Sequence, residues 1–344
     1  MRSRIKDLTD QYRTDVLNSI RPRIIDSIPD EIELNEDKPK GHFSRALSRL
    51  FRKKIAVFCL IVIIIIYSLG IFSPVISRYS YSEPDYQAIR QPPSWDHWAG
   101  TDRAGRDLFT RVHWAVQNTV ILTMIGMLSG GLLLGVTLGL AAGYYGKFVD
   151  ALIMRSGEVL SVVPTFFLVL MIAATLRGRI KNSMIWLEDN TFLSGLISAG
   201  IADYIVISFA LVVFGWFSTA RLVRGQVLFL RESPYVEAAR ALGASTPRIL
   251  FRHILPNAIS PLIVSVTMSM GTMVGVEIFL SWVGVGIQPP RPSLGIMLYE
   301  AGHVSVLRNE PWMILATGLV RWLLIFCWSL LGDALNDVFN PRTQ

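Results

Sequence analysis

Six long apolar stretches, separated by polar segments, set the pattern of this chain. They lie near residues 54–76, 117–143, 157–176, 201–222, 259–284 and 311–332. A helix needs roughly 20 mostly apolar residues to cross about 30 Å of hydrocarbon, and each stretch has about that length. The pattern therefore predicts an all-α membrane protein with six transmembrane helices.

Two of these stretches carry residues that shape a membrane helix. In the second stretch, Gly131, Gly135, Gly139 and Gly143 repeat every four residues, a spacing that lets neighbouring backbones approach closely in lipid. We therefore expect this helix to be buried in the bundle. In the third stretch, Pro164 predicts a kink, because proline removes one backbone hydrogen bond and crowds the preceding turn.

The segment before the first span divides into two parts. Residues 1–40 mix both charge signs and indicate a cytoplasmic N-terminal extension, either a short amphipathic arm or a weakly ordered tail. Residues 41–53 place apolar side chains on one helical face and arginines on the other, which is typical of an amphipathic helix in the membrane interface. The apolar face consists of Phe43, Ala46, Leu47, Leu50 and Phe51, and the basic face of Arg45, Arg49 and Arg52. Residues 54–344 then form a six-span domain.

The distribution of positive charge predicts the orientation in the membrane. A basic cluster precedes the first span, so the positive-inside rule places the N-terminus in the cytoplasm. Six crossings return the C-terminus to the same side, together with the arginine-rich loop at 223–258. The basic loop at Arg177, Arg179 and Lys181 disagrees, because the same count places it outside. The basic cluster that precedes the first span consists of Arg45, Arg49, Arg52, Lys53 and Lys54.

Composition agrees with a membrane protein. The chain is 51% hydrophobic and only 17% charged, with a mean hydropathy of +0.44. Its net charge of +7 does not indicate a nucleic-acid partner, since membrane proteins concentrate Lys and Arg in cytoplasmic loops. Cys59 and Cys327 both lie in apolar runs, which favours packing over a disulfide or a metal site. The first apolar run follows a long charged segment, so we expect a retained anchor rather than a cleaved signal peptide.

The loop at 232–257 is polar and basic, and it lies between two apolar spans. Helix-start and helix-stop residues in it predict two short helices joined by a glycine. Its alanines have little bulk, so another protein surface can come close. The loop is therefore predicted to be a protruding contact surface for a partner protein. Ser233 and Pro234 begin the first helix, Gly243 ends it, Thr246 and Pro247 begin the second, and Pro256 ends that one. The alanines are Ala238, Ala239 and Ala241.

The spacing of this loop resembles the EAA loop in permease subunits of bacterial ABC importers. The matching residues are Glu237, Ala238, Ala239, Gly243, Leu255 and Pro256. The resemblance implies a cytoplasmic coupling helix that sits in a cleft of an ATPase subunit. His253 departs from the pattern, since many members have an apolar residue there. The run from Arg252 to Asn257 nevertheless resembles the branch that imports di- and oligopeptides.

A second motif precedes the second span and consists of Gly100, Thr101, Asp102, Gly105, Arg106 and Asp107. The glycines permit tight turns, and the Asp and Arg side chains can tie the loop to itself; the alternative is a capped turn before a helix. The segment resembles the HxLGTDxxGRD signature of dipeptide and oligopeptide permeases, with Ala99 in place of leucine. Further similarity follows the fifth span and continues to the C-terminal end, so that the resemblance covers residues 43–342.

Residues with catalytic chemistry are sparse. The chain has Gly146-Lys147-Phe148 where a phosphate loop would need Gly-Lys-Ser or Gly-Lys-Thr, and its five histidines have no metal-ligand spacing. We therefore expect a non-catalytic protein without a metal site, whose energy comes from another chain. An ion-coupled secondary transporter is the rival hypothesis, for which Glu277 and Arg321 are the clear midplane candidates.

An arginine deep in a span should not face lipid, so we expect Arg321 to face the interior of the complex with Glu277 as its partner. Thr317, Gly318 and Ser329 lie near the same helical stripe and suit a packed or wet interior. Two interpretations remain open. The arginine either attracts a passing carboxylate or forms a structural ion pair.

Taken with the motifs, the resemblance implies a type I ABC importer permease that translocates di- or oligopeptides across the bacterial cytoplasmic membrane. It implies a second homologous permease, two ABC ATPase subunits that bind ATP and Mg, and an extracytoplasmic solute-binding protein as partners. Membrane lipid surrounds the chain, and neither nucleic acid nor a cofactor is expected in it. Relatives with these motifs also carry metal chelates or other small solutes, so these cargoes stay as alternatives.

Overall fold

A computed structural model describes residues 48–192, 194–197 and 199–339 of the chain. The described residues group into one compact unit. The predicted extension at 1–40 lies outside the described residues, as does the interfacial helix at 41–53 except for its helical end at 48–52. Within the described residues the structure is almost wholly helical, with one isolated β-bridge between Thr101 and Asp107.

The helices follow one another with few long connections. They are α3 (Lys54–Ile71), α4 (Ser73–Ile76), α5 (Leu108–Ile125), the π-helix η1 (Gly126–Leu134), α6 (Gly135–Tyr145), α7 (Lys147–Val162), α8 (Thr165–Asn190), α9 (Ile201–Leu230), α10 (Pro234–Ala241), α11 (Thr246–Arg248), the π-helix η2 (Ile249–Ile254), α12 (Leu255–Trp282), α13 (Leu294–Ala301), α14 (Val304–Asn309) and α15 (Pro311–Phe339).

Five helices in the described part of the chain are long and apolar enough to cross a membrane, and a sixth results if one bent pair counts as a single span. The five are Lys54–Ile71, Leu108–Tyr145, Ile201–Leu230, Thr246–Trp282 and Pro311–Phe339. The predicted all-α membrane fold is confirmed. The second span begins at Leu108 rather than 117, because Arg111, His113 and Asn118 are buried against other elements and do not end the helix.

The third predicted span, 157–176, is wrong in shape. Instead of one kinked helix, α7 and α8 meet at 91° across a break at Val163 and Pro164. Proline disfavours helical geometry in the residue before it, and Val163 is extended, with φ −84° and ψ 128°. The basic residues at 177–181 are likewise not in a loop, since α8 continues to Asn190.

The predicted glycine stripe forms the contact between α6 and α9. A Cβ on Gly135 would lie 2.7 Å from Cβ of Thr219, and one on Gly139 would lie 2.7 Å from the carbonyl oxygen of Ala220. Only glycine allows backbones to approach this closely, so the expected burial of the second span is confirmed. On the other side of the bundle, Cys59 of α3 and Cys327 of α15 are free thiols, both buried in one apolar cluster.

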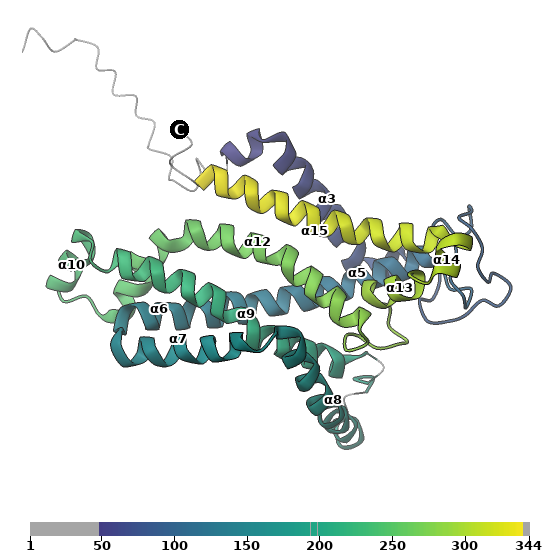
Figure 1. Cartoon of the computed structure of the whole chain (residues 1–344), viewed down its shortest axis with the longest axis horizontal. Coiled ribbons are helices and arrows are strands. Elements are labelled where there is room, and N and C mark those ends of the chain that lie inside the picture. Colours follow the sequence, from purple (N-terminus) through teal and green to yellow (C-terminus); the bar gives the residue numbers. More distant parts are fainter. Residues whose placement is uncertain (1–47, 193, 198, 340–344) are drawn as a thin grey trace, which may run out of the picture. The chain divides into compact units, whose positions relative to one another are not determined.

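The two motif-bearing segments lie at opposite ends of the bundle. The loop with α10 is at one end of α9, and the segment before α5 lies with α13 and α14 at the other end (Figure 1). The contacts of α9 agree, because Gly200, just before its first residue, lies against Arg291, whereas its last residues lead into α10. A helix of 30 residues spans about 45 Å, so membrane-spanning helices separate the two segments.

Candidate functional site

The loop at 232–257 has the predicted helix–glycine–helix form. Ser233 is the extended N-cap residue of α10, although its side chain makes no capping hydrogen bond, and Pro234 occupies the first turn. Gly243 has φ +78° and no atom within 4 Å of a Cβ built on it. Backbone conformation rather than space therefore favours glycine at this position.

One side of this loop is packed and the other is open. Val236, Ile249 and Ile254 are buried in an apolar cluster with Val223 and Val227 of α9. The loop is therefore anchored firmly to the end of the bundle. The opposite side presents exposed side chains of the EAA motif and an 89%-exposed Leu242. The exposed motif residues are Glu237, Ala238, Gly243 and Pro256, with Ala239 and Leu255 half-buried.

Pro256 does not end the second helix of the loop, contrary to the prediction. The helix runs without interruption for 37 residues from Thr246 to Trp282. The π-helical turns of η2 directly precede Leu255 and Pro256, and the wider turns accommodate a residue that cannot donate a backbone hydrogen bond. The second half of the loop is consequently continuous with α12.

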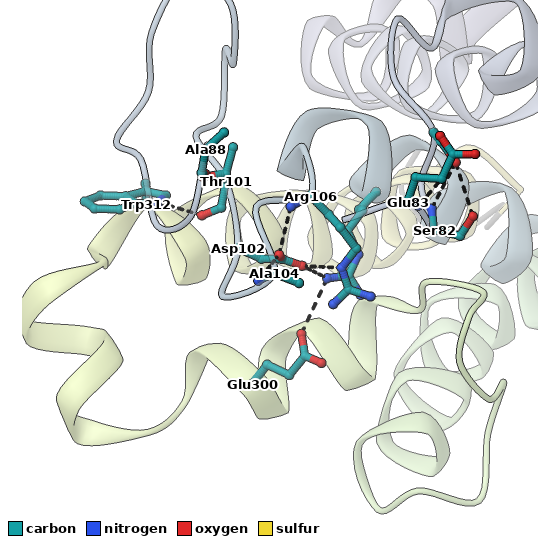
Figure 2. Close-up of polar contacts among 11 residues, drawn as sticks. Ser82, Glu83, Ala88, Thr101, Asp102, Ala104, Arg106, Glu300 and Trp312 are labelled. Atoms are coloured by element: carbon teal, nitrogen blue, oxygen red, sulfur yellow. Dashed lines mark hydrogen bonds and ion pairs between the residues drawn. The ribbon is translucent and has the colours of Figure 1, made fainter. Parts of the chain in front are cut away.

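At the other end of the bundle, Asp102 is the centre of a buried polar network (Figure 2). Its carboxylate accepts hydrogen bonds from the backbone N–H of Ala104 at 2.8 Å and of Arg106 at 3.0 Å. It also accepts one from Nε of Arg106 at 2.8 Å and one from the Arg111 guanidinium. Arg111 reaches Glu300 of α13 at 3.6 Å, so the network connects this loop to the last third of the chain.

The remaining signature residues fix the same loop. Gly105 has φ +78°, and a Cβ on it would lie 1.7 Å from the carbonyl oxygen of Asp85. Thr101 donates to the carbonyl oxygen of Ala88 at 2.5 Å, and Asp107 caps α5 by accepting from the N–H of Thr110 at 2.8 Å. The sequence predicted either a loop held together by its own Asp and Arg side chains or a capped turn before a helix. Both features are present.

Gly100 packs directly against the side chain of Trp312. Its φ is +76°, and a Cβ on it would lie 2.7 Å from Cδ1 of Trp312, the second residue of α15. The Trp312 indole N–H donates to the carbonyl oxygen of Thr101 at 3.3 Å (Figure 2). The signature motif is thus a structural clasp between the start of α5 and the start of α15.

Glu277 and Arg321 do not form the predicted pair. The Glu277 side chain has 0% exposure and accepts hydrogen bonds from Thr119 of α5 at 2.8 Å and Ser281 at 3.0 Å. Arg321 lies on the exposed flank of α15, whereas Thr317 of the same predicted stripe is fully buried. The pairing could not be read from the sequence, because the position of a residue along a span does not determine which flank of the helix faces its neighbours.

A second polar cluster, which the sequence did not predict, lies at the outer-loop end of α9. Nε of Arg177 is 3.1 Å from Oδ1 of Asp203, and its Nη2 donates to the carbonyl oxygens of Val285 at 2.6 Å and Gly286 at 2.8 Å. This contact accounts for Arg177, which holds the segment after α12 rather than forming part of a free loop, whereas Arg179 and Lys181 are exposed on α8. The partner Asp203 lies on the next helix and the carbonyl groups lie more than a hundred positions away, so no local signal in the sequence marks these contacts.

Arg291 extends this cluster. Its Nη1 donates to the Tyr204 hydroxyl at 3.0 Å, and the hydroxyl in turn donates to Asn118. Asn118 donates to the carbonyl oxygen of Pro292 at 2.6 Å. Helices α5 and α9 therefore hold the segment between α12 and α13 in place.

A cavity of about 220 Å³ lies in the middle of the bundle, between η1, α8, α9 and α12. Apolar side chains dominate its wall, with two methionines and four hydroxyl groups among them. The methionines are Met127 and Met273, and the hydroxyls belong to Ser218, Thr219, Ser269 and Thr272. Gly131 also borders this space, and here the missing side chain opens room rather than a helix contact.

Comparison with known proteins agrees with this arrangement. Residues 135–344, more than half of the chain, match the family described as "Binding-protein-dependent transport system inner membrane component". The chain belongs to this family. Residues 42–93 also match the "N-terminal TM domain of oligopeptide transport permease C". The predicted permease of the dipeptide and oligopeptide branch and the predicted type I ABC importer fold are confirmed.

Curated relatives cover nearly the full length of this binding-protein-dependent permease. The "Dipeptide transport system permease protein DppC" of Alkalihalophilus pseudofirmus is 33% identical over 91% of this chain and 96% of its own. The "Oligopeptide transport system permease protein OppC" of Bacillus subtilis is 33% identical over 87% and 89%. The "Glutathione transport system permease protein GsiD" of Pectobacterium atrosepticum is 32% identical over 86% and 90%.

Family membership settles several general points. The chain is a multi-pass inner-membrane subunit of an ABC importer, and it is not the catalytic one, because ATP hydrolysis belongs to a separate subunit. Binding-protein-dependent permeases work with an ATPase and with a substrate-binding protein.

Proposed function

We propose that this permease translocates di- or oligopeptides. We also propose that the loop at 232–257 transmits the conformational changes of the ATPase subunits to the translocation path. The observation that carries the proposal is the exposed, firmly anchored EAA loop that continues directly into α12. The names of the relatives support a peptide cargo, since they are dipeptide, oligopeptide and glutathione permeases.

The exposed face of the loop is the proposed ATPase contact. Leu242 supplies an apolar side chain, and the small residues Ala238 and Ala239 let a cleft close tightly around α10. ATP and Mg are bound by the partner ATPases. When these close, they shift α10, and because η2 leads without a break into α12, the shift tilts α12 relative to α9. The helix thus moves as a rigid body, as helices do in other conformational switches.

The central cavity is the proposed half of the path contributed by this chain. It lies between η1, α9 and α12, so tilting α12 changes its width. Hydroxyl groups offer hydrogen bonds to a peptide backbone, whereas methionine side chains adapt to different cargo surfaces. No charged residue lines the cavity among the described residues, which suits cargo of varied sequence.

The complete transporter contains a second, homologous permease that closes the other half of the path, together with two ATPases. In this assembly the N- and C-termini and the EAA loop face the cytoplasm, and the solute-binding protein docks at the end with the Asp102 clasp. Arg321 faces the second permease rather than lipid, since a charge at this depth in hydrocarbon costs about 2.5–3.5 kcal/mol on insertion scales. Glu277 acts structurally, by tying α12 to α5 through Thr119.

Two glycines with a similar positive φ provide a matched test of coupling. Gly243 and Gly284 have φ of +78° and +86°, and neither has an atom within 4 Å of a built Cβ. Valine therefore introduces similar local strain at each, but only Gly243 lies in the proposed ATPase contact. We expect Gly243→Val to lose ATPase co-purification and stimulation by the loaded solute-binding protein, and Gly284→Val to keep the co-purification. Equal co-purification in both variants would exclude the proposed contact.

The cargo is tested separately from coupling. Mass spectrometry of the ligand carried by the cognate solute-binding protein should identify a short peptide. A metal chelate or a sugar there would refute the peptide assignment and leave the coupling assignment intact.

A further inference from the structure

Two adjoining cavities lie on a different side of the bundle from the proposed path. The first has a volume of about 200 Å³, and its wall comes from α3, α5 and α15. The second, of about 340 Å³, lies next to it under the segment that follows α4. Leu69 and Phe109 line both, so the two cavities adjoin at these side chains, and we refer to them together as the groove at the outer-loop end of the bundle.

The inner part of the groove is apolar. Its wall consists mainly of aliphatic side chains, among them Ile66, Val112, Val116, Ala316 and Val320. Ala316 and Val320 lie five and nine residues from the start of α15, which corresponds to roughly 8–14 Å along the helix. This depth lies within one leaflet of a bilayer whose hydrocarbon core is about 30 Å thick.

One polar side chain interrupts the apolar wall. His113 is 4% exposed and lines the inner cavity, and its Nδ1 has no hydrogen-bond partner within the described part of the chain. Its ring packs edge-on against Phe109, with centroids 4.0 Å apart. A buried, unpaired ring nitrogen in an apolar wall is costly unless a ligand supplies the missing partner.

The outer part of the groove carries charges of both signs. Arg78 is exposed, lies 5.8 Å from the centroid of the Trp98 ring, and makes no ion pair with any residue that the structure describes. Asp96 lines the same cavity and is also exposed. Asp107, the other acidic residue of this wall, is already engaged by His97 and by the start of α5. A cation and an anion are thus both available to a ligand.

We propose that this groove binds phosphatidylethanolamine. The phosphate pairs with Arg78, and the ammonium pairs with Asp96. An ester carbonyl oxygen accepts a hydrogen bond from Nδ1–H of His113, and one acyl chain follows the apolar wall between α5 and α15. The order of these groups along the groove, from charged to polar to apolar, is the order of the parts of a phospholipid. A peptide cargo would not match an apolar inner wall that opens within one leaflet.

Ala316 and Leu315 provide a matched pair for the test. Ala316 lines the groove, whereas its neighbour Leu315 is 66% exposed and does not. Tryptophan at Ala316 fills the inner cavity, and tryptophan at Leu315 adds the same bulk outside it. Arg78→Gln is matched by Arg308→Gln, an exposed arginine of α14 that lies outside the groove.

The assembled transporter, purified with its partner subunits, is incubated with phosphatidylethanolamine that carries a photoreactive group in one acyl chain. Cross-linked peptides are then mapped by mass spectrometry. We expect cross-links around Val112 and Val320 in the wild type and in Leu315→Trp, and their loss in Ala316→Trp. Arg78→Gln should lower the apparent affinity about tenfold, in line with the loss of a charged hydrogen bond, and His113→Phe roughly threefold. Arg308→Gln should leave it unchanged.

Three results would overturn the proposal. The first is a cross-link pattern that Ala316→Trp leaves as in the wild type. The second is equal affinity for phosphatidylethanolamine and phosphatidylglycerol together with no effect of Arg78→Gln, which would indicate unspecific lipid contact. The third is a cross-link from Val320→Cys to the second permease, which would place a protein helix in the groove. If Ala316→Trp does not assemble, Arg78→Gln and His113→Phe decide the question.

Discussion

Removal of the Asp102 carboxylate should destabilise the protein far more than removal of an exposed carboxylate with the same ion-pair distance. Asp102 is 1% exposed and accepts four hydrogen bonds, two of them from guanidinium groups. Its substitution by alanine leaves Arg111, itself 3% exposed, with only Glu300 at 3.6 Å. Leaving a buried charge without its partner costs about 3–5 kcal/mol.

The matched control is Glu158→Ala. Arg155 and Glu158 are also 2.8 Å apart, like Arg106 and Asp102, but their side chains are 81% and 49% exposed. An exposed pair of this kind contributes about 0.2–1 kcal/mol. The comparison therefore separates burial from distance. An Asp102→Asn variant should fall between the two, because the amide oxygen still accepts from a backbone N–H while the charge is lost.

Thermal inactivation of the assembled complex, followed by size-exclusion chromatography, measures the difference. A destabilisation of 1 kcal/mol lowers the midpoint by on the order of 2 °C in a chain of this size, so Asp102→Ala should lose about 6–10 °C. Glu158→Ala should stay within about 2 °C of the wild type. A similar midpoint for both alanine variants would refute the assignment of a buried clasp.

The remaining predictions concern particular positions. Gly105→Ala should lower the midpoint clearly more than Gly243→Ala, because both glycines have φ +78° but only the first meets a backbone atom at 1.7 Å; equal losses would contradict this. Glu277→Ala should cost about 2–5 kcal/mol, because it opens a cavity, leaves the Ser281 hydroxyl without its acceptor and leaves Thr119 only the carbonyl oxygen of Ala115, whereas Glu277→Gln should cost less; the same thermal assay decides. In a background without native cysteines, Asn182→Cys and Ser245→Cys should react with an impermeant thiol reagent from opposite sides, and labelling of Ser245→Cys alone from outside would invert the proposed orientation.

Local signals in the sequence were sufficient for much of the architecture. Apolar runs locate the membrane helices, and the left-handed glycine at 243 follows from the pattern of caps and breakers around it. The glycine stripe likewise predicts the contact of α6 with α9, since a four-residue repeat places small residues on one face.

Features that depend on distant partners were not predictable. Glu277 has Thr119 as its partner, 158 positions away, and nothing local distinguishes it from a residue of the path. The role of Arg177 depends on Asp203 and on carbonyl groups beyond residue 284. Proline signals were ambiguous for a related reason. Pro164 breaks its helix completely, whereas Pro256 is tolerated because η2 precedes it.

Transport by the complete complex in proteoliposomes tests the central claim most directly. The measurement is accumulation of a labelled peptide that the cognate solute-binding protein binds, with wild-type permease and with Gly243→Val at equal amounts of inserted permease. The account predicts accumulation that requires ATP, persists when ion gradients are collapsed, and is lost in Gly243→Val. Accumulation without ATP that an ionophore abolishes, or undiminished ATP-driven accumulation in Gly243→Val, would contradict it.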